Sequence, residues 1–105
     1  MSEWVEIADI EEFKNTDRKL VDLGGQYQIG LFKLPDGFYA TSAWCSHQKA
    51  TIMHGDIEDY EIECPLHGAR FDLRDGQHKC LPAVRPIASY NVKVEGSKVL
   101  LEKPE

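Results

Sequence analysis

The sequence predicts an all-β domain, built as a small antiparallel sandwich or barrel. Most segments that alternate between apolar and polar residues are short, and no segment has the period of a long helix. Turn residues separate these segments at intervals of about 8 to 12 residues, which is typical of small β proteins. With 105 residues, the chain has enough material for one domain and too little for two.

In the first part of the chain, strands are expected at residues 4–7, 19–22, 26–34 and 38–41. Between the first two strands, residues 8–13 predict one helical turn. We expect Asp9 to cap this turn and Ile10 and Phe13 to share its buried face. Pro35-Asp36-Gly37 is a strong turn signal between the last two strands.

In the second part, strands are expected at residues 60–64, 71–73, 90–94 and 98–102. The segment 81–86 contains two prolines and no helical pattern, which indicates a loop. Glu95-Gly96-Ser97 predicts the turn of a final hairpin.

Composition and charge restrict the function and the location. The formal net charge of −6 argues against a nucleic-acid partner, which would require a basic face. No segment approaches the roughly 20 apolar residues of a membrane span, and the acidic start lacks the apolar run of a signal peptide. The three cysteines are an odd number, which favours a metal site or a free thiol over a disulfide framework. We therefore expect a cytoplasmic protein that does not contact a membrane.

Two short motifs predict a metal site. Cys45-Ser46-His47 is followed after sixteen residues by Cys64-Pro65-Leu66-His67-Gly68. Thiolate and neutral imidazole are strong ligands for transition metals, and two Cys with two His satisfy a structural zinc ion. The same four side chains also satisfy a Rieske-type [2Fe–2S] cluster, in which one iron has two Cys ligands and the other two His ligands. A pair of loops that each provide one Cys and one His favours the cluster.

These motifs closely resemble those of the Rieske ferredoxin family. The likeness extends to Gly55, Phe71 and Pro82-Ala83, and covers nearly the whole chain. It implies a Rieske (ISP-like) fold in one domain, 1–105, with a β base at 1–42 and 76–105 and an inserted cluster-binding subdomain at about 43–75. The resemblance also implies one [2Fe–2S] cluster, with Cys45 and Cys64 on the inner iron and His47 and His67 on the outer iron. A docking rim is expected around the histidines, formed by Gln48, Lys49, Leu66, Gly68 and Pro82.

By resemblance, the chain is a one-electron carrier and not an enzyme. Such a ferredoxin passes electrons from an NAD(P)H-dependent flavoprotein reductase to a terminal aromatic-ring-hydroxylating dioxygenase. Three alternatives remain open: the ferredoxin of a diiron toluene-type monooxygenase, the small subunit of a nitrite reductase, and a structural zinc or interaction module without a redox role. We expect a monomer. Cys80 is interpreted as a structural or free cysteine, and His54 and His78 as surface or capping residues. The acidic run 56–63 is interpreted as a solvated hairpin face or part of a docking surface.

One departure within the wider family concerns the reduction potential. Ala50 and Leu66 stand where the Rieske proteins of cytochrome complexes have a pair of disulfide-bonded cysteines. Ala69 and Phe71 offer no hydroxyl group to the cluster sulfurs. Fewer donors leave the charge on sulfur less stabilised, so we expect a low-potential Rieske protein.

Overall fold

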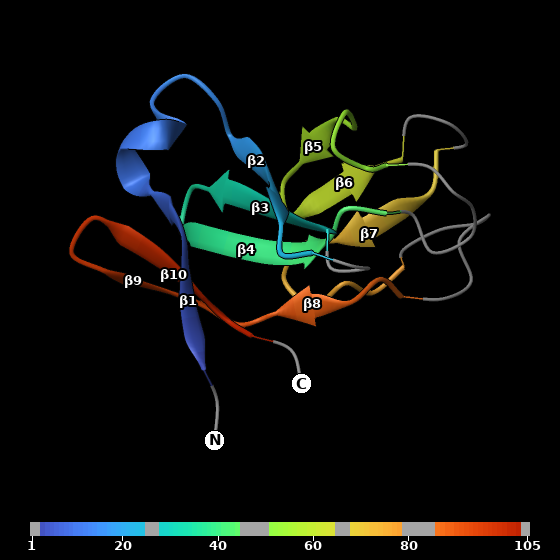
Figure 1. The fold of residues 1–105 in the computed structure, drawn as a ribbon. Helices are drawn as coiled ribbons and strands as arrows, with labels where there is room; N and C mark the ends of the chain where they lie inside the picture. The colour runs from blue at the N-terminus through green and yellow to red at the C-terminus, as the bar shows by residue number, and fades with distance from the viewer. Residues whose placement is uncertain (1–2, 25–27, 45–50, 65–67, 79–85, 104–105) are drawn as a thin grey trace.

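The computed structural model describes residues 3–24, 28–44, 51–64, 68–78 and 86–103, and these parts of the chain form three antiparallel sheets (Figure 1). The elements, in chain order, are β1 (Trp4–Asp9), the 3₁₀ helix η1 (Ile10–Phe13), β2 (Arg18–Asp22), β3 (Gln28–Leu34), β4 (Gly37–Ser42), β5 (Ile57–Glu58), β6 (Glu61–Glu63), β7 (Arg70–Asp72), β8 (Ser89–Tyr90), β9 (Val92–Glu95) and β10 (Lys98–Glu102). The sheets have the strand orders β1-β10-β9, β2-β3-β4-β8 and β5-β6-β7. The predicted all-β class is confirmed.

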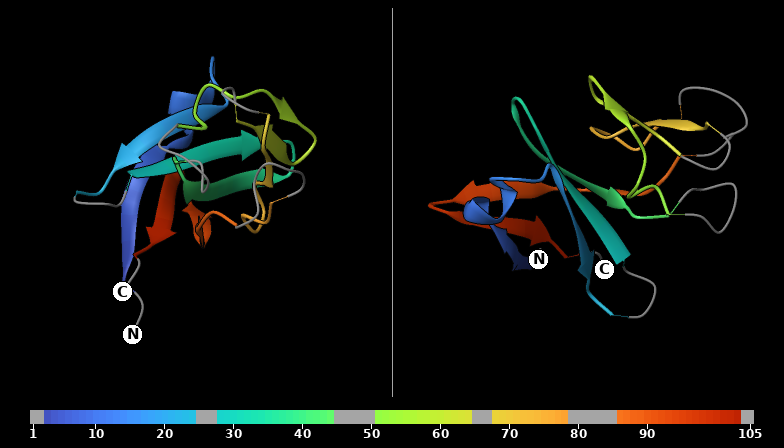
Figure 2. Two further views of the ribbon diagram at one scale, coloured as in Figure 1. Left: turned by 90° about the vertical axis from the view of Figure 1, so that its right-hand side faces the viewer. Right: turned by 90° about the horizontal axis from the view of Figure 1, so that it is seen from above.

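Strand β3 lies at the centre of the molecule, because both of its faces are buried. Ile29 and Leu31 belong to an apolar cluster shared with the β1-β10-β9 sheet. Phe32 and Leu34 point the other way, into a second cluster shared with the β5-β6-β7 sheet. The three sheets therefore stack as layers with the β2-β3-β4-β8 sheet in the middle (Figure 2). A fully buried phenylalanine such as Phe32 contributes about 1.5–3 kcal/mol through loss of apolar surface from water.

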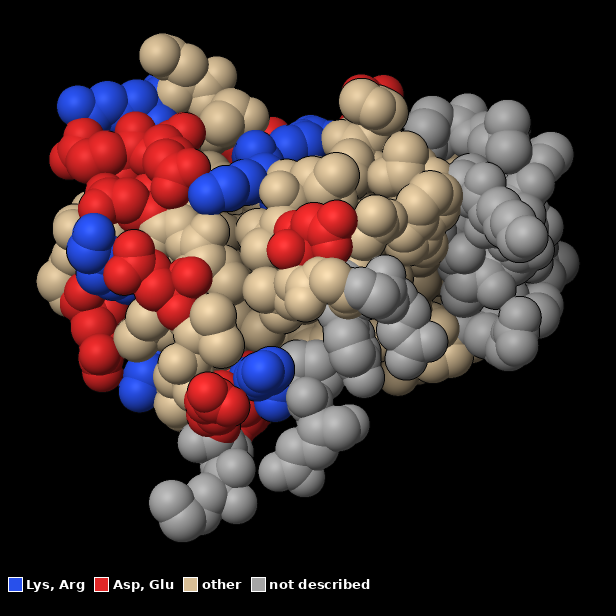
Figure 3. All heavy atoms as spheres, in the orientation of Figure 1, with Lys and Arg blue, Asp and Glu red and all other residues tan. Residues whose placement is uncertain are grey.

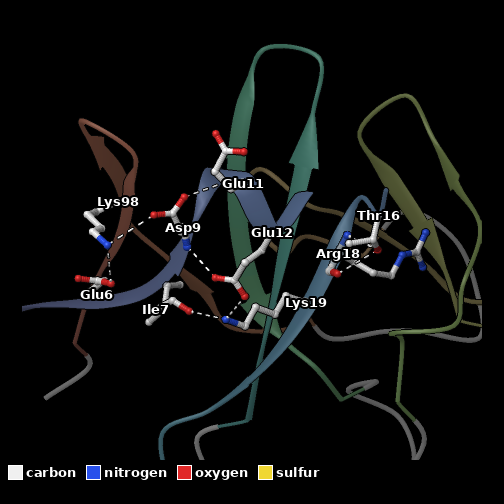
Figure 4. A network of polar contacts seen from close by, with 9 residues as sticks. All are labelled: Glu6, Ile7, Asp9, Glu11, Glu12, Thr16, Arg18, Lys19 and Lys98. Atoms are coloured by element: carbon white, nitrogen blue, oxygen red, sulfur yellow. Dashed lines mark hydrogen bonds and ion pairs between the residues drawn. The ribbon is translucent and has the colours of Figure 1, made fainter. Parts of the chain in front are cut away.

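The helical turn after β1 is capped as the sequence predicted. The Asp9 side chain accepts a hydrogen bond from the Glu11 backbone N–H. The Glu12 carboxylate in turn accepts one from the Asp9 backbone N–H at 2.7 Å (Figure 4). Phe13 is buried against the base, with its ring 5.1 Å from that of Phe38. Ile10 remains 37% exposed, so the expectation that it shares the buried face of Phe13 was wrong. Phe13 is the buried residue of this 3₁₀ turn.

The strand expected at residues 90–94 is two strands. β8 ends at Tyr90 and pairs with β4, whereas β9 begins at Val92 and pairs with β10. Asn91, between them, accepts a hydrogen bond from the Glu102 N–H at its carbonyl and donates from Nδ2 to the Glu102 carboxylate at 2.8 Å. The chain thus passes from one sheet to another at a single residue, which an alternating pattern does not reveal.

A polar cluster joins the third sheet to the β3–β4 turn. Tyr39 on β4 and Tyr60 in the β5–β6 turn both donate hydrogen bonds to Oδ2 of Asp36, at 3.0 and 3.1 Å. The guanidinium of Arg74 lies 4.2 Å from the centre of the Tyr60 ring and also pairs with the buried Asp72. The hydrogen bond to Asp36 is the main cause of the raised pKa of both tyrosines.

We expect these two tyrosines to make the stability of the protein sensitive to alkaline pH. Their raised pKa values mean that the neutral hydroxyls are favoured in the folded state, so the stabilisation is present below their ordinary pKa of about 10 and is lost as the pH rises through the folded-state values. The urea midpoints of the wild type and of the double variant Tyr39→Phe/Tyr60→Phe should differ clearly at about pH 8, and the difference should shrink as the pH rises beyond the ordinary tyrosine pKa of about 10. A difference in urea midpoint that does not change between about pH 8 and more alkaline pH would contradict this role.

Candidate metal centre

The first Cys–His motif lies in a segment whose two ends are held together. Residues 45–50 are outside the described residues, but Trp44 and Thr51 on either side pair in an antiparallel bridge. The Ala43 carbonyl accepts hydrogen bonds from the Ile52 N–H at 2.9 Å and from the Thr51 hydroxyl at 3.0 Å. The two residues that flank the segment with Cys45 and His47 are therefore held side by side just after β4.

The second motif begins at the end of β6 and is closed in a similar way. The Cys64 N–H donates to the Ala69 carbonyl at 2.6 Å, and the Gly68 N–H donates to the Cys64 carbonyl at 2.9 Å. Gly68 has φ of +73°, a left-handed conformation that glycine adopts without strain. The thiol-bearing residue Cys64 is fully buried, and its thiol is free.

One apolar cluster contains described residues that flank both motifs. It contains Ala43 and Ile52 from the ends of the first loop, and Cys64, Ala69 and Phe71 from the second loop and the strand that follows it. Residues that are far apart in sequence are thus packed at one place. The described residues on either side of the two Cys–His motifs therefore pack in one apolar cluster, as a site that shares four ligands requires.

A glycine between the motifs allows the segment behind the first loop to lie against the strand that carries Cys64. A Cβ atom at Gly55 would overlap the backbone carbonyl of Glu63. The Glu63 N–H donates to the Asp56 carbonyl at 2.9 Å, so a hydrogen bond also holds the two backbones together at the next residue. Gly55 was recognised in the sequence only as part of the family likeness; its structural reason is this close backbone contact.

Of the predicted site residues, the structure places Cys64 and Gly68. The others lie outside the described residues: Cys45, His47, Gln48, Lys49, Leu66, His67 and Pro82. Among the described side chains, no three His, Cys, Asp or Glu residues gather as metal ligands. The donor set of two thiols and two imidazoles nevertheless fits a Rieske cluster, and a buried free cysteine at the base of a closed loop fits its inner ligand.

The acidic run 56–63 forms the β5–β6 hairpin, on which Asp56, Glu58 and Asp59 are exposed. Arg70 on β7 lies 3.7 Å from Glu61 and 3.8 Å from Glu63. These partly exposed, long ion pairs contribute at most about 1 kcal/mol. Figure 3 shows that further Asp and Glu side chains gather over the base, away from this hairpin.

Trp44 directly precedes the first motif, and His78 follows β7. Trp44 is 42% exposed, donates from Nε1 to Gln28 Oε1 at 2.7 Å, and lines a groove of about 430 Å³ together with Leu20 and the exposed His54. His78 pairs with Phe71 as an isolated bridge, and its buried Nδ1 has no hydrogen-bond partner among the described residues. His54 is a surface residue as expected, whereas His78 is partly buried.

No helix among the described residues is long and apolar enough to cross a membrane.

Comparison with known proteins supports the metal centre. The ferredoxin component of the naphthalene 1,2-dioxygenase/salicylate 5-hydroxylase systems of Ralstonia sp. is 35% identical over 99 residues, which are 94% of each chain. The ferredoxin of carbazole 1,9a-dioxygenase from Nocardioides aromaticivorans IC177 has a TM-score of 0.85 at 35% identity, over 93% of this chain and 95% of that one. A ferredoxin solved in complex with its reduced oxygenase, also of carbazole 1,9a-dioxygenase, has a TM-score of 0.86 at 26% identity, over 97% of both chains.

The fold alone is shared more widely. A putative NADH-dependent nitrite reductase small subunit from Mycobacterium tuberculosis has a TM-score of 0.85 at 18% identity, over 100% of this chain and 98% of that one. The model of the Rieske [2Fe-2S] domain matches residues 3–91, which include both Cys–His motifs. The predicted Rieske fold and the predicted Rieske-type cofactor are confirmed: the chain belongs to the Rieske [2Fe–2S] domain family.

Proposed function

We propose that this protein is the ferredoxin of an aromatic-ring-hydroxylating dioxygenase system and that Cys45, His47, Cys64 and His67 hold its [2Fe–2S] cluster. The observation that carries the proposal is the shared apolar cluster, in which Ala43 and Ile52, on either side of the first motif, pack together with the buried Cys64. The likeness to ferredoxin components over nearly the whole chain supports the role as a carrier. We place the cluster-binding subdomain at about 43–75 and the base at 1–42 and 76–105.

When bound, the cluster supplies one-electron redox chemistry. Two thiolates and two neutral imidazoles balance two Fe³⁺ and two sulfides, so the oxidised site has no net charge, whereas four thiolates would leave it at −2. Adding an electron to a neutral site costs less, which raises the potential above that of an all-Cys centre. Each His also keeps a proton on the ring nitrogen that does not face the iron. Negative charge at the site favours that proton.

Two redox partners follow from this role. We propose a flavoprotein reductase as the donor and the terminal oxygenase as the acceptor, the second supported by the related ferredoxin that was solved with its oxygenase. The contact surface would be the rim of Gln48, Lys49, Leu66, Gly68 and Pro82 around the outer histidines. We further propose a cytoplasmic monomer, since transient electron-transfer complexes suit a small single domain.

The function is tested by reconstitution. The purified protein should contain two irons and two sulfides, show the optical and EPR spectra of a Rieske centre, and couple a flavoprotein reductase to an arene dioxygenase. A colourless protein with one bound zinc would overturn the cluster. A Rieske spectrum without transfer to any dioxygenase would overturn only the proposed partners.

His67→Cys should lower the reduction potential, because a thiolate adds one negative charge to the site. It should also weaken the dependence of the potential on alkaline pH, because one imidazole proton is removed. Potentiometric titration of the wild type and of His67→Cys at several pH values measures both effects. The same titration tests the low potential expected of the wild type, which a value in the low part of the Rieske range would confirm. An intact cluster with an unchanged potential would contradict the assignment of His67 as a ligand.

Electron transfer should slow as salt is added, because exposed acidic residues steer encounter with a basic partner surface. At low ionic strength, the double variant Glu58→Gln/Asp59→Asn should react several-fold more slowly with its partner than the wild type and show a shallower salt dependence. Glu95→Gln, an exposed acid on β9 in the base, is the matched control and should react like the wild type. Equal rates for all three proteins would remove the β5–β6 hairpin from the docking surface.

A further inference from the structure

We propose that Arg18 is a positioning residue for the cluster: its guanidinium holds the backbone behind the first Cys–His loop against the base and thereby sets the relative placement of both ligand loops. The inference rests on the four ligands proposed above, but it concerns a residue that lies far from both motifs in the sequence and belongs to β2 of the base.

The contacts of Arg18 are short and specific. Its Nη1 donates to the Met53 carbonyl at 2.9 Å and to the Gly55 carbonyl at 2.6 Å. Its Nε donates to Oδ1 of Asp17 at 2.8 Å, and the guanidinium is the main cause of the lowered pKa of that carboxyl. The side chain is only 23% exposed. Charged hydrogen bonds that are largely shielded from water are the stronger kind.

The segment that Arg18 holds makes contact with both ligand loops. On one side, the Gly55 N–H donates to the Ile52 carbonyl, and the Ile52 N–H in turn donates to the Ala43 carbonyl beneath the first loop. On the other side, the α-carbon of Gly55 lies directly against the carbonyl of Glu63, the residue before Cys64. A displacement at Gly55 would therefore reach Cys64 through one backbone contact and the start of the first loop through two hydrogen bonds.

Packing reinforces the same segment without replacing the guanidinium. Met53 lies over the backbone of β3, where a Cβ atom on Gly30 would be 2.8 Å from its sulfur. This contact is apolar and does not restrain the direction of the carbonyl groups. Two carbonyls that point at one nitrogen have only a narrow range of orientations, so the guanidinium provides the restraint that packing lacks.

The neighbouring Lys19 provides a matched control. It stands next to Arg18 on β2 but points away from the held segment, donating to the Ile7 carbonyl at 3.0 Å and to Glu12 at 2.7 Å (Figure 4). Lys19→Gln therefore removes a cation and its hydrogen bonds from the base alone. Arg18→Gln removes a cation whose hydrogen bonds cross to the segment behind the cluster loop.

The experiment compares cluster-loaded wild type, Arg18→Gln, Arg18→Lys and Lys19→Gln by EPR of the reduced state, by potentiometric titration and by the rate of bleaching in chelator. Arg18→Gln should shift the EPR g values and raise the bleaching rate at least roughly ten-fold, the change expected for the loss of one charge-assisted hydrogen bond. Arg18→Lys, which keeps the charge but not the planar fork, should lie between it and the wild type. Lys19→Gln should keep the wild-type spectrum and bleaching rate.

Each other outcome decides against a specific statement. If Arg18→Gln unfolds at a lower temperature but keeps the g values, the potential and the bleaching rate of the wild type, Arg18 is a stabilising residue only and the inference is wrong. If Arg18→Gln does not fold, Arg18→Lys decides: wild-type EPR spectra and a wild-type bleaching rate in that variant would also show that the inference is wrong. If the wild type itself shows no Rieske spectrum, it is the proposed cluster that fails.

Discussion

The double-sided burial of β3 is the constraint on which the rest of the structure depends. One face of this strand packs with the β1-β10-β9 sheet through Ile29 and Leu31, and the other packs with the β5-β6-β7 sheet through Phe32 and Leu34. A strand buried on both faces cannot slip by one residue without exchanging its two apolar sets. The positions of the β1-β10-β9 and β5-β6-β7 sheets relative to β3 are therefore fixed by packing, although the three sheets are not joined by strand pairing.

The candidate metal centre is built on this register by backbone contacts more than by side chains. The ends of the first loop are fastened at Ala43, and the second loop is closed between Cys64 and Ala69. Gly55 lets the two segments touch, and Arg18 ties them to the base. Ligands on loops with fastened ends lose less freedom when they bind a metal, which favours retention of the cluster.

The third sheet is attached to the rest of the molecule by two different kinds of polar contact. At the β3–β4 turn, Tyr39 and Tyr60 share Asp36, and this attachment weakens when the tyrosines ionise. At β2, Arg18 donates from Nη1 to the Met53 and Gly55 carbonyls, in the segment that leads into β5. The segment next to the first Cys–His motif is thus held by hydrogen bonds from a guanidinium to two backbone carbonyls, which suits a carrier whose ligands must keep their geometry in both oxidation states.

Much of the fold could be predicted from the sequence: the all-β class, most strands and the Asp9 cap. The Rieske family could be predicted as well, because alternation, turn residues and the spacing of Cys and His are all local signals. The break at Asn91, the exposure of Ile10 and the buried nitrogen of His78 were not visible there, because each depends on which sheet lies next to the residue. The role of Arg18 is of the same kind. It contacts Met53 and Gly55, which are 35 and 37 positions further along the chain, and nothing in the adjacent sequence distinguishes it from Lys19. The sequence by itself determined which side chains can hold the cluster, and only the tertiary structure decided what holds their loops in place, because long-range backbone contacts leave no local pattern.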